Sequence, residues 1–301
     1  MFNLALFSGS QAYYADAAAP REQFHSGEQF AADKIVLLNV QGTIMPPFTK
    51  RILNAIDAAK KDEAVKGLVL AVDSPGGLVP DSHQIYNRLK EFSEQKPIVV
   101  AMQRMAASGG YYIAMGGGES CRIFAEPTTW TGSIGVIIPR FDATALAEKV
   151  GLASDPLKTG PFKDALSPFR EVTDEERAVW TEILDDAFDR FIDVIAENRS
   201  ELDHDAAKAL ATGQIYTAEQ AHENGLVDEI GYVPEAIEFL QKELGLDKAR
   251  IVKYQFPVSL MDLVAGSIES QQPASQWRDI LEATVPQAMY LCSWAPAIPN
   301  R

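Results

Sequence analysis

Three short, almost uninterrupted apolar runs, separated by segments with helical periodicity, constrain the fold of this chain more than any other feature. The runs cover residues 34–40, 67–72 and 97–101. In the segments between them apolar residues recur at helical spacing: Ile52, Ile56 and Ala59 in the first, and Ile85, Leu89 and Phe92 in the second. Strands that are apolar on both faces lie between layers of helices. We therefore predict an α/β fold with a mainly parallel sheet covered by helices.

The second half of the chain carries mostly helical signals. Thr173 with Glu176, and Thr217 with Gln220, form capping boxes that each predict a helix start. Pro234 lies where the first turn of a further helix is expected. The long helix after Thr173 carries one apolar stripe: Trp180, Ile183, Leu184, Ala187, Phe188, Phe191, Ile192 and Ile195. This stripe could pack on the core or on a neighbouring chain.

The two ends of the chain lack this alternation. The apolar run at residues 2–7 is short for a signal peptide and has no Lys or Arg before it, so we expect residues 1–33 to form a flexible leader. Residues 256–301 mix Pro, Ser, Gln and isolated aromatics, and we expect an irregular tail with one or two short helices. Residues 34–255 then form a single domain. The sequence contains no apolar stretch of the roughly 18 residues that a membrane-spanning helix needs.

Composition excludes several classes of partner and cofactor. With 27 Lys and Arg against 42 Asp and Glu, the formal net charge is −15, which argues against nucleic acid or an anionic membrane surface as the main partner. The two cysteines, Cys121 and Cys292, are too few and too far apart for a thiolate zinc site. The sequence also lacks a His-Glu-x-x-His motif. We therefore expect no metal and no cofactor.

Two segments that follow predicted strands are candidates for chemistry. Residues 73–77 read Asp-Ser-Pro-Gly-Gly, and two adjacent glycines let a substrate approach backbone N–H groups closely. Ser108 lies at the next strand–helix junction, with small residues on both sides. A serine there is commonly only a helix cap. Capping alone does not explain the small neighbours, whereas a substrate backbone passing close to Ser108 does.

A serine nucleophile needs a base. Of the four histidines, His83 is the best placed to act on Ser108, but the sequence supplies no evident carboxylate to orient it, so a Ser-His-Asp triad has little support. Lys163 follows a turn and adjoins Phe162, unlike the lysines on polar helix faces. A lysine acts as a base when burial lowers its pKa from about 10.4 to roughly 7–8. Taken alone, however, this segment is more typical of a surface lysine.

Four motifs in register resemble the signal peptide peptidase SppA family of Ser/Lys peptidases, which have the ClpP/crotonase fold. They are Asp-Ser-Pro-Gly-Gly at 73–77, Ala-Ser-Gly-Gly-Tyr-Tyr-Ile-Ala at 107–114, Thr-Gly-Ser-Ile-Gly-Val at 131–136 and Gly-Pro-Phe-Lys-Asp at 160–164. The resemblance runs from about residue 34 to about residue 254. It includes the segments at 209–216 and 221–228.

The resemblance implies roles for five residues. Ser108 is the expected nucleophile and Lys163 the expected general base, with oxyanion-hole N–H groups from Gly77 and Gly109. Ser133 is expected to orient the lysine amine. The implied function is that of a serine endopeptidase that cleaves apolar peptides such as remnant signal peptides. For a chain with one repeat unit, the resemblance also implies a ring-like homo-oligomer whose neighbouring subunits share each active site.

The chain departs from the family pattern in two places. The family usually carries an N-terminal membrane anchor, which this sequence lacks, so membrane association is expected to be peripheral and the compartment is undetermined. The glycine-rich segment at 115–119 looks longer than usual and either widens the groove or forms a surface excursion.

Two other functions are compatible with the same fold. One is an acyl-CoA hydratase or isomerase of the crotonase type, for which Asp73 is the one carboxylate beside the glycines. The other is a non-catalytic scaffold that forms the ring without turnover. The presence of both Ser108 and Lys163 favours the peptidase.

Overall fold

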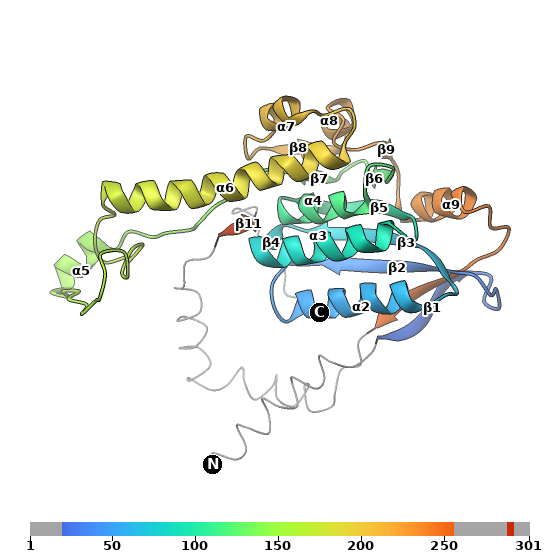
Figure 1. Cartoon of the computed structure of the whole chain (residues 1–301), viewed down its shortest axis with the longest axis horizontal. Helices are drawn as coiled ribbons and strands as arrows, with labels where there is room; N and C mark the ends of the chain where they lie inside the picture. The colour runs from blue at the N-terminus through green and yellow to red at the C-terminus, as the bar shows by residue number, and fades with distance from the viewer. Residues whose placement is uncertain (1–19, 256–287, 292–301) are drawn as a thin grey trace, which may run out of the picture.

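The computed structural model describes residues 20–255 and 288–291, and it contains a large, mainly parallel sheet with helices on both faces (Figure 1). The strands are β1 (Arg21–Gly27), β2 (Lys34–Gln41), β3 (Val65–Ser74), β4 (Gly76–Leu78), β5 (Ile98–Ala107), β6 (Ile123–Ala125), β7 (Trp130–Gly132), β8 (Ile215–Thr217), β9 (Glu229–Ile230), β10 (Arg250–Gln255) and β11 (Met289–Leu291). The helices are α2 (Phe48–Lys61), α3 (Val79–Ser93), α4 (Gly109–Ala114), the 3-10 turn η1 (Met115–Gly117), α5 (Thr144–Val150), α6 (Asp174–Asn198), α7 (His204–Leu210), α8 (Ala218–Glu223) and α9 (Val233–Glu243).

The sheet has the strand order β1-β10-β2-β3-β5-β6-β9, and the pairs from β10 to β9 are parallel. β1 pairs with β10 in the antiparallel direction at one edge, while β7 lies parallel to the end of β5 and carries antiparallel β8. This arrangement confirms the predicted fold class, and the three apolar runs are β2, β3 and β5 at its centre. A second, two-stranded sheet joins β4 to β11.

Alternating side chains of the central strands enter two different cores. Val36 and Leu38 of β2 pack into the larger core, which includes residues of α2, α3, α4 and α6. Ile35 and Leu37 point to the opposite face, where they pack with residues of α9. Each buried aliphatic side chain contributes about 1.5–3 kcal/mol. Burial on both faces explains why consecutive positions along the central runs of these strands are apolar.

The predicted helix starts are confirmed by hydrogen bonds. At the start of α6, the Glu176 N–H donates to Thr173 Oγ1 (3.2 Å) and the Thr173 N–H donates to the Glu176 carboxylate (3.0 Å). Thr217 and Gln220 make the same pair of bonds at the start of α8. Pro234 lies in the first turn of α9.

The apolar stripe of α6 is buried over only part of its length. Phe191, Ile192 and Ile195 are fully buried in the larger core. Nearer the start of the helix Ile183 is 42% exposed, because that half of α6 projects away from the sheet together with α5 (Figure 1). Within the described residues the stripe is therefore fully covered toward the end of α6 and only partly covered nearer its start.

Both ends of the chain differ from the expected irregular structure. Residues 21–27 form β1, which is held at the sheet edge by backbone pairing with β10 rather than by an apolar face, so its sequence carries no strong strand signal. Residues 289–291 form β11, a strand where we expected coil and short helices. The remaining residues of both predicted end segments lie outside the part of the chain that the structure describes.

Candidate active site

Ser108 lies in a strained backbone conformation at the junction of β5 and α4. Its φ is +54°, its side chain is almost fully buried, and its N–H donates to the Gly132 carbonyl at 2.7 Å. Positive φ at a non-glycine residue costs about 1–3 kcal/mol and is concentrated at functional sites. Within residues 20–255 and 288–291, Ser108 Oγ has no hydrogen-bond partner. A buried hydroxyl without a partner is available to a substrate.

Gly77 and Gly109 lie against each other beside Ser108. A Cβ built on Gly109 would lie 3.1 Å from the Gly77 amide nitrogen and 2.6 Å from Ser82 Oγ. A Cβ on Gly77 would lie 2.0 Å from the Ile44 carbonyl oxygen, so only glycine fits there. The structure thus brings together Ser108 and the two glycines proposed for the oxyanion hole.

Ser133 lies at the end of β7, on the strand next to Ser108. It also has a positive φ of +48°, and its N–H donates to the Gln214 carbonyl at 2.7 Å. Because β5 and β7 are paired with Ala107 opposite Gly132, the following residues, Ser108 and Ser133, leave the sheet side by side. Ser133 is 8% exposed and therefore borders the same small region.

Lys163 is not brought to this cluster. It lies in the segment between α5 and α6, which projects from the sheet (Figure 1), and its side chain is exposed. Its backbone N–H donates to the Gly160 carbonyl (3.3 Å). Its amine has no hydrogen bond or ion pair with Ser108 or any other described residue.

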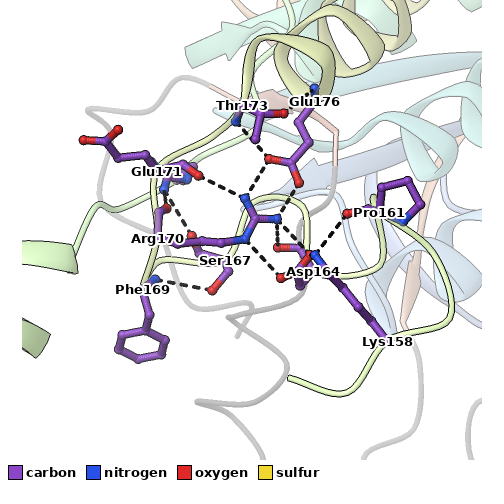
Figure 2. A network of polar contacts seen from close by, with 10 residues as sticks. Lys158, Pro161, Asp164, Ser167, Phe169, Arg170, Glu171, Thr173 and Glu176 are labelled. Carbon is purple, nitrogen blue, oxygen red and sulfur yellow. Dashed lines mark hydrogen bonds and ion pairs between the residues drawn. The ribbon is translucent and has the colours of Figure 1, made fainter. Parts of the chain in front are cut away.

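A network of charged groups holds the turn that carries Lys163 (Figure 2). The Arg170 guanidinium donates to both Asp164 carboxylate oxygens (2.8 and 3.0 Å) and to the Glu176 carboxylate (2.8 Å). Lys158 adds a further bond to Asp164 (2.6 Å). These contacts hold the pKa of Asp164 well below its usual range and lower the pKa of Glu176 to about 2. Both carboxylates are ionised at neutral pH and fix the residue next to Lys163.

A third positive φ lies in this turn, at Leu166 (+65°). Ser108, Ser133 and Leu166 are the non-glycine residues with positive φ in the described part of the chain. Backbone strain is therefore concentrated around the expected nucleophile, its neighbour and the lysine turn.

His83 and Asp73, which other mechanisms would require, are occupied elsewhere. His83 Nδ1 is 2.7 Å from the Tyr112 hydroxyl, and burial lowers the pKa of His83, with a further contribution from Arg190. Asp73 accepts a 2.8 Å hydrogen bond from Arg104 Nε within an ion pair. Neither side chain is positioned as a base for Ser108, and the ion pair disfavours Asp73 as the acid and base of a hydratase.

Sequence reasoning missed one feature near Ser108 and misinterpreted another segment. Ser82, in the first turn of α3, has a buried Oγ without a partner among the described residues, but serine is too common at helix starts to signal a site. The glycine-rich segment at 115–119 includes η1, which packs under α3: a Cβ on Gly116 would lie 2.6 Å from Leu89 Cβ. Its glycines permit close packing of helices and do not widen a groove.

Comparison with known proteins shows which family the chain belongs to. The family model described as Peptidase family S49 matches residues 90–247, and the model for Clp protease matches residues 22–131. A protein of Enterococcus faecium named for signal peptide peptidase SppA is 37% identical over 265 residues, which cover 84% of this chain and 75% of that protein. The chain belongs to peptidase family S49.

Two further proteins that are named as proteases share long stretches with this chain. A protein of Synechocystis named as a protease is 38% identical over 219 residues, covering 72% of this chain and 77% of its own length. The chloroplastic serine protease SPPA of Arabidopsis thaliana is 30% identical over 236 residues, covering 75% of this chain and 34% of that protein. This family S49 member is thus a serine peptidase that acts on peptides. None of its described helices is long and apolar enough to cross a membrane.

Proposed function

We propose that Ser108 is the nucleophile and that Lys163 of a neighbouring chain is the general base of a Ser/Lys endopeptidase that cleaves apolar peptides, such as remnant signal peptides. The observation that carries the proposal is the separation of the two residues. Ser108 is buried, and its hydroxyl has no hydrogen-bond partner among the described residues. Lys163 is exposed on the segment between α5 and α6, and the next residue, Asp164, is held by hydrogen bonds from Arg170. A projection that holds a lysine away from its own chain is suited to reach another one.

In the proposed reaction, Ser108 Oγ attacks the carbonyl carbon of the substrate and its proton passes to the Lys163 amine. The negative charge on the carbonyl oxygen is stabilised by the N–H groups of Gly77 and Gly109. The C–N bond then breaks, and the leaving amine takes the proton from Lys163. Water then attacks the Ser108 ester and gives a proton to the Lys163 amine, and this proton returns to Ser108 Oγ as the acyl product leaves. Ser133, beside Ser108, would hold the lysine amine in place.

The apolar surface of the projection supports assembly into a homo-oligomer. Exposed large apolar side chains cluster along it: Phe141, Leu146, Val150, Leu152, Leu157, Phe162, Phe169, Val179 and Ile183. Monomeric soluble proteins rarely expose large contiguous apolar patches, and such patches mark interaction sites. A neighbouring chain that covers this surface would also exclude water from the Lys163 side chain.

Active-site labelling tests the proposed function. We expect a serine-reactive phosphonate to modify Ser108 alone, as located by peptide mapping. Labelling should be lost in Ser108→Ala and strongly slowed in Lys163→Ala, while Ser93→Ala, which removes an exposed hydroxyl of α3, labels like the unmodified protein. If Ser108→Ala is labelled as strongly as the unmodified protein, Ser108 is not the nucleophile. If the unmodified protein is neither labelled nor active as a peptidase, the result favours a non-catalytic scaffold.

A further inference from the structure

A short buried piece of backbone lies behind the turn that carries Gly77. Residues 42–44, between β2 and α2, run beside the Asp-Ser-Pro-Gly-Gly turn, and we call them the backing segment. Three backbone hydrogen bonds join the backing segment to the turn and to β4: Gly42 N–H to the Asp73 carbonyl (3.0 Å), Ile44 N–H to the Gly76 carbonyl (2.8 Å) and Leu78 N–H to the Ile44 carbonyl (2.8 Å).

These bonds determine where the Gly77 N–H points. The Gly76 carbonyl and the Gly77 N–H belong to one trans peptide group, in which they point in opposite directions. Because the carbonyl points to Ile44, the N–H points away from the backing segment. Gly109 lies close by, since a Cβ built on Gly76 would be 2.7 Å from the Gly109 amide nitrogen. Any group that fixes Gly76 therefore also fixes one proposed oxyanion donor relative to the other.

The hydroxyl of Ser74 fixes Gly76 from its other side. Ser74 is fully buried, its Oγ–H donates to the Gly42 carbonyl at 2.7 Å, and its Oγ accepts the Gly76 N–H at 3.1 Å. We call this pair of bonds the serine relay. It connects the turn to a residue 32 positions earlier in the chain, so it is more than a local turn contact. Gly76 is thus held at its N–H by Ser74 and at its carbonyl by Ile44.

This turn needs such a hold because of its composition. Gly76 has a φ of +102°, and two adjacent glycines have no side chains to restrict backbone rotation. Donors in an oxyanion hole are effective when they are already oriented before charge develops on the substrate. Alanine at position 74 would leave the Gly76 N–H buried without its acceptor and would remove the link to Gly42.

We propose that Ser74 is a positioning residue of the peptidase, and that the serine relay orients the Gly77 N–H toward the oxyanion. This inference rests on the proposed function and adds to it a residue that does not touch the substrate. Its effect is confined to the transition state, because only there does the substrate oxygen carry the developing negative charge.

Kinetics and a tetrahedral-adduct probe test the positioning role. On a succinyl-Leu-Leu-Leu peptide with a fluorogenic amide, Ser74→Ala should lower kcat by about tenfold and change KM by less than about twofold. The affinity for acetyl-Leu-Leu-leucinal, an aldehyde that forms a tetrahedral adduct with Ser108, should fall by about the same factor as kcat. Ser74→Cys, whose thiol is a weak donor and acceptor, should lie between Ser74→Ala and the unmodified protein.

Thr129→Val is the matched control. Thr129 is also fully buried, and its Oγ1 donates to the carbonyls of Gln103 (2.5 Å) and Met102 (3.2 Å), neither of which belongs to the turn. The control should lower the unfolding temperature as Ser74→Ala does, but leave kcat unchanged. An equal loss of kcat in both variants would show a general effect of lost stability and overturn the positioning role.

Hydrogen exchange separates this inference from the proposed function. The amides of residues 76 and 78, followed by mass spectrometry, should exchange about tenfold faster in Ser74→Ala and at the normal rate in Thr129→Val. Unchanged exchange in Ser74→Ala would overturn the serine relay, and faster exchange with an unchanged kcat would overturn its role in positioning. If exchange is faster but the unmodified protein cleaves no peptide, the serine relay stands and the proposed function fails.

Discussion

The backbone N–H of Ser108 donates to the Gly132 carbonyl at 2.7 Å, and this bond couples the two serines of the site. It extends the parallel pairing of β5 and β7 by one residue, past Ala107 and Gly132. Both chains then turn sharply, with positive φ at Ser108 and at Ser133. The sheet therefore sets the separation of the two hydroxyls before any substrate binds.

Ser108→Ala is expected to abolish peptide cleavage and leave the fold intact. The change removes a hydroxyl without a hydrogen-bond partner, so little stability is lost, while the covalent route disappears. Activity should fall by roughly 10³-fold or more, with an unchanged circular dichroism spectrum. Cleavage of an apolar reporter peptide at a near-normal rate would contradict the assignment.

Gly109→Ala is expected to lower kcat by about 10²-fold, because its methyl group would crowd the Gly77 amide at 3.1 Å and disturb the oxyanion hole. KM should change much less. Gly231→Ala is a suitable control, since it adds a methyl group after β9, at the sheet edge, where the nearest atom belongs to the Phe124 ring. Equal kinetics for the two variants would exclude Gly109 from the hole.

Arg170→Gln should loosen the turn that carries Lys163 in a pH-dependent way. Arg170 lowers the pKa of Asp164 and of Glu176 from their ordinary 3.8 and 4.5, so the stabilisation is complete above those values and is lost as the pH falls below them. The variant should unfold a few degrees below the unmodified protein at pH 7, and the difference should shrink steadily as the pH falls from about 4.5 to the folded-state pKa of Glu176, about 2. A difference that is constant with pH would show that the ion pairs are not its source.

Lys163→Arg is expected to be as inactive as Lys163→Ala, because a guanidinium does not release its proton at working pH. Both changes lie on an exposed side chain, so unfolding temperatures should be unaffected. Lys149→Ala, on the neighbouring helix α5, controls for loss of a positive charge from the projection. Appreciable activity in Lys163→Arg would exclude the lysine as the base.

The central fold could be predicted from sequence because buried strands and amphipathic helices leave periodic patterns. The capping box of Thr173 and Glu176 even predicted the exact residue at which α6 begins. Ser108 and Gly77 could be named as candidates because their small neighbours are unusual for a cap or a plain turn, and their roles stay predictions. Such local signals depend only on residues that are close in sequence.

The remaining features depend on contacts that leave no local pattern. Tyr290 is an isolated aromatic in a segment rich in Pro, Ser and Gln, and only its docking on Tyr112 and Phe191 makes the segment a strand. The stripe of α6 looked continuous, yet Ile183 remains exposed because nothing within the described chain covers it. The apolar periodicity of a sequence predicts that such a surface exists, but it does not show which partner covers it.

Mixing two inactive variants tests the shared active site most directly. Ser108→Ala and Lys163→Ala chains are unfolded together and refolded as an equimolar mixture, with each variant refolded alone as the control. If Ser108 and Lys163 come from different chains, mixed oligomers contain interfaces with both residues intact, and a substantial fraction of the peptidase activity should return. Mixed oligomers that form, as shown by differential tags, but remain inactive would contradict a site shared between chains.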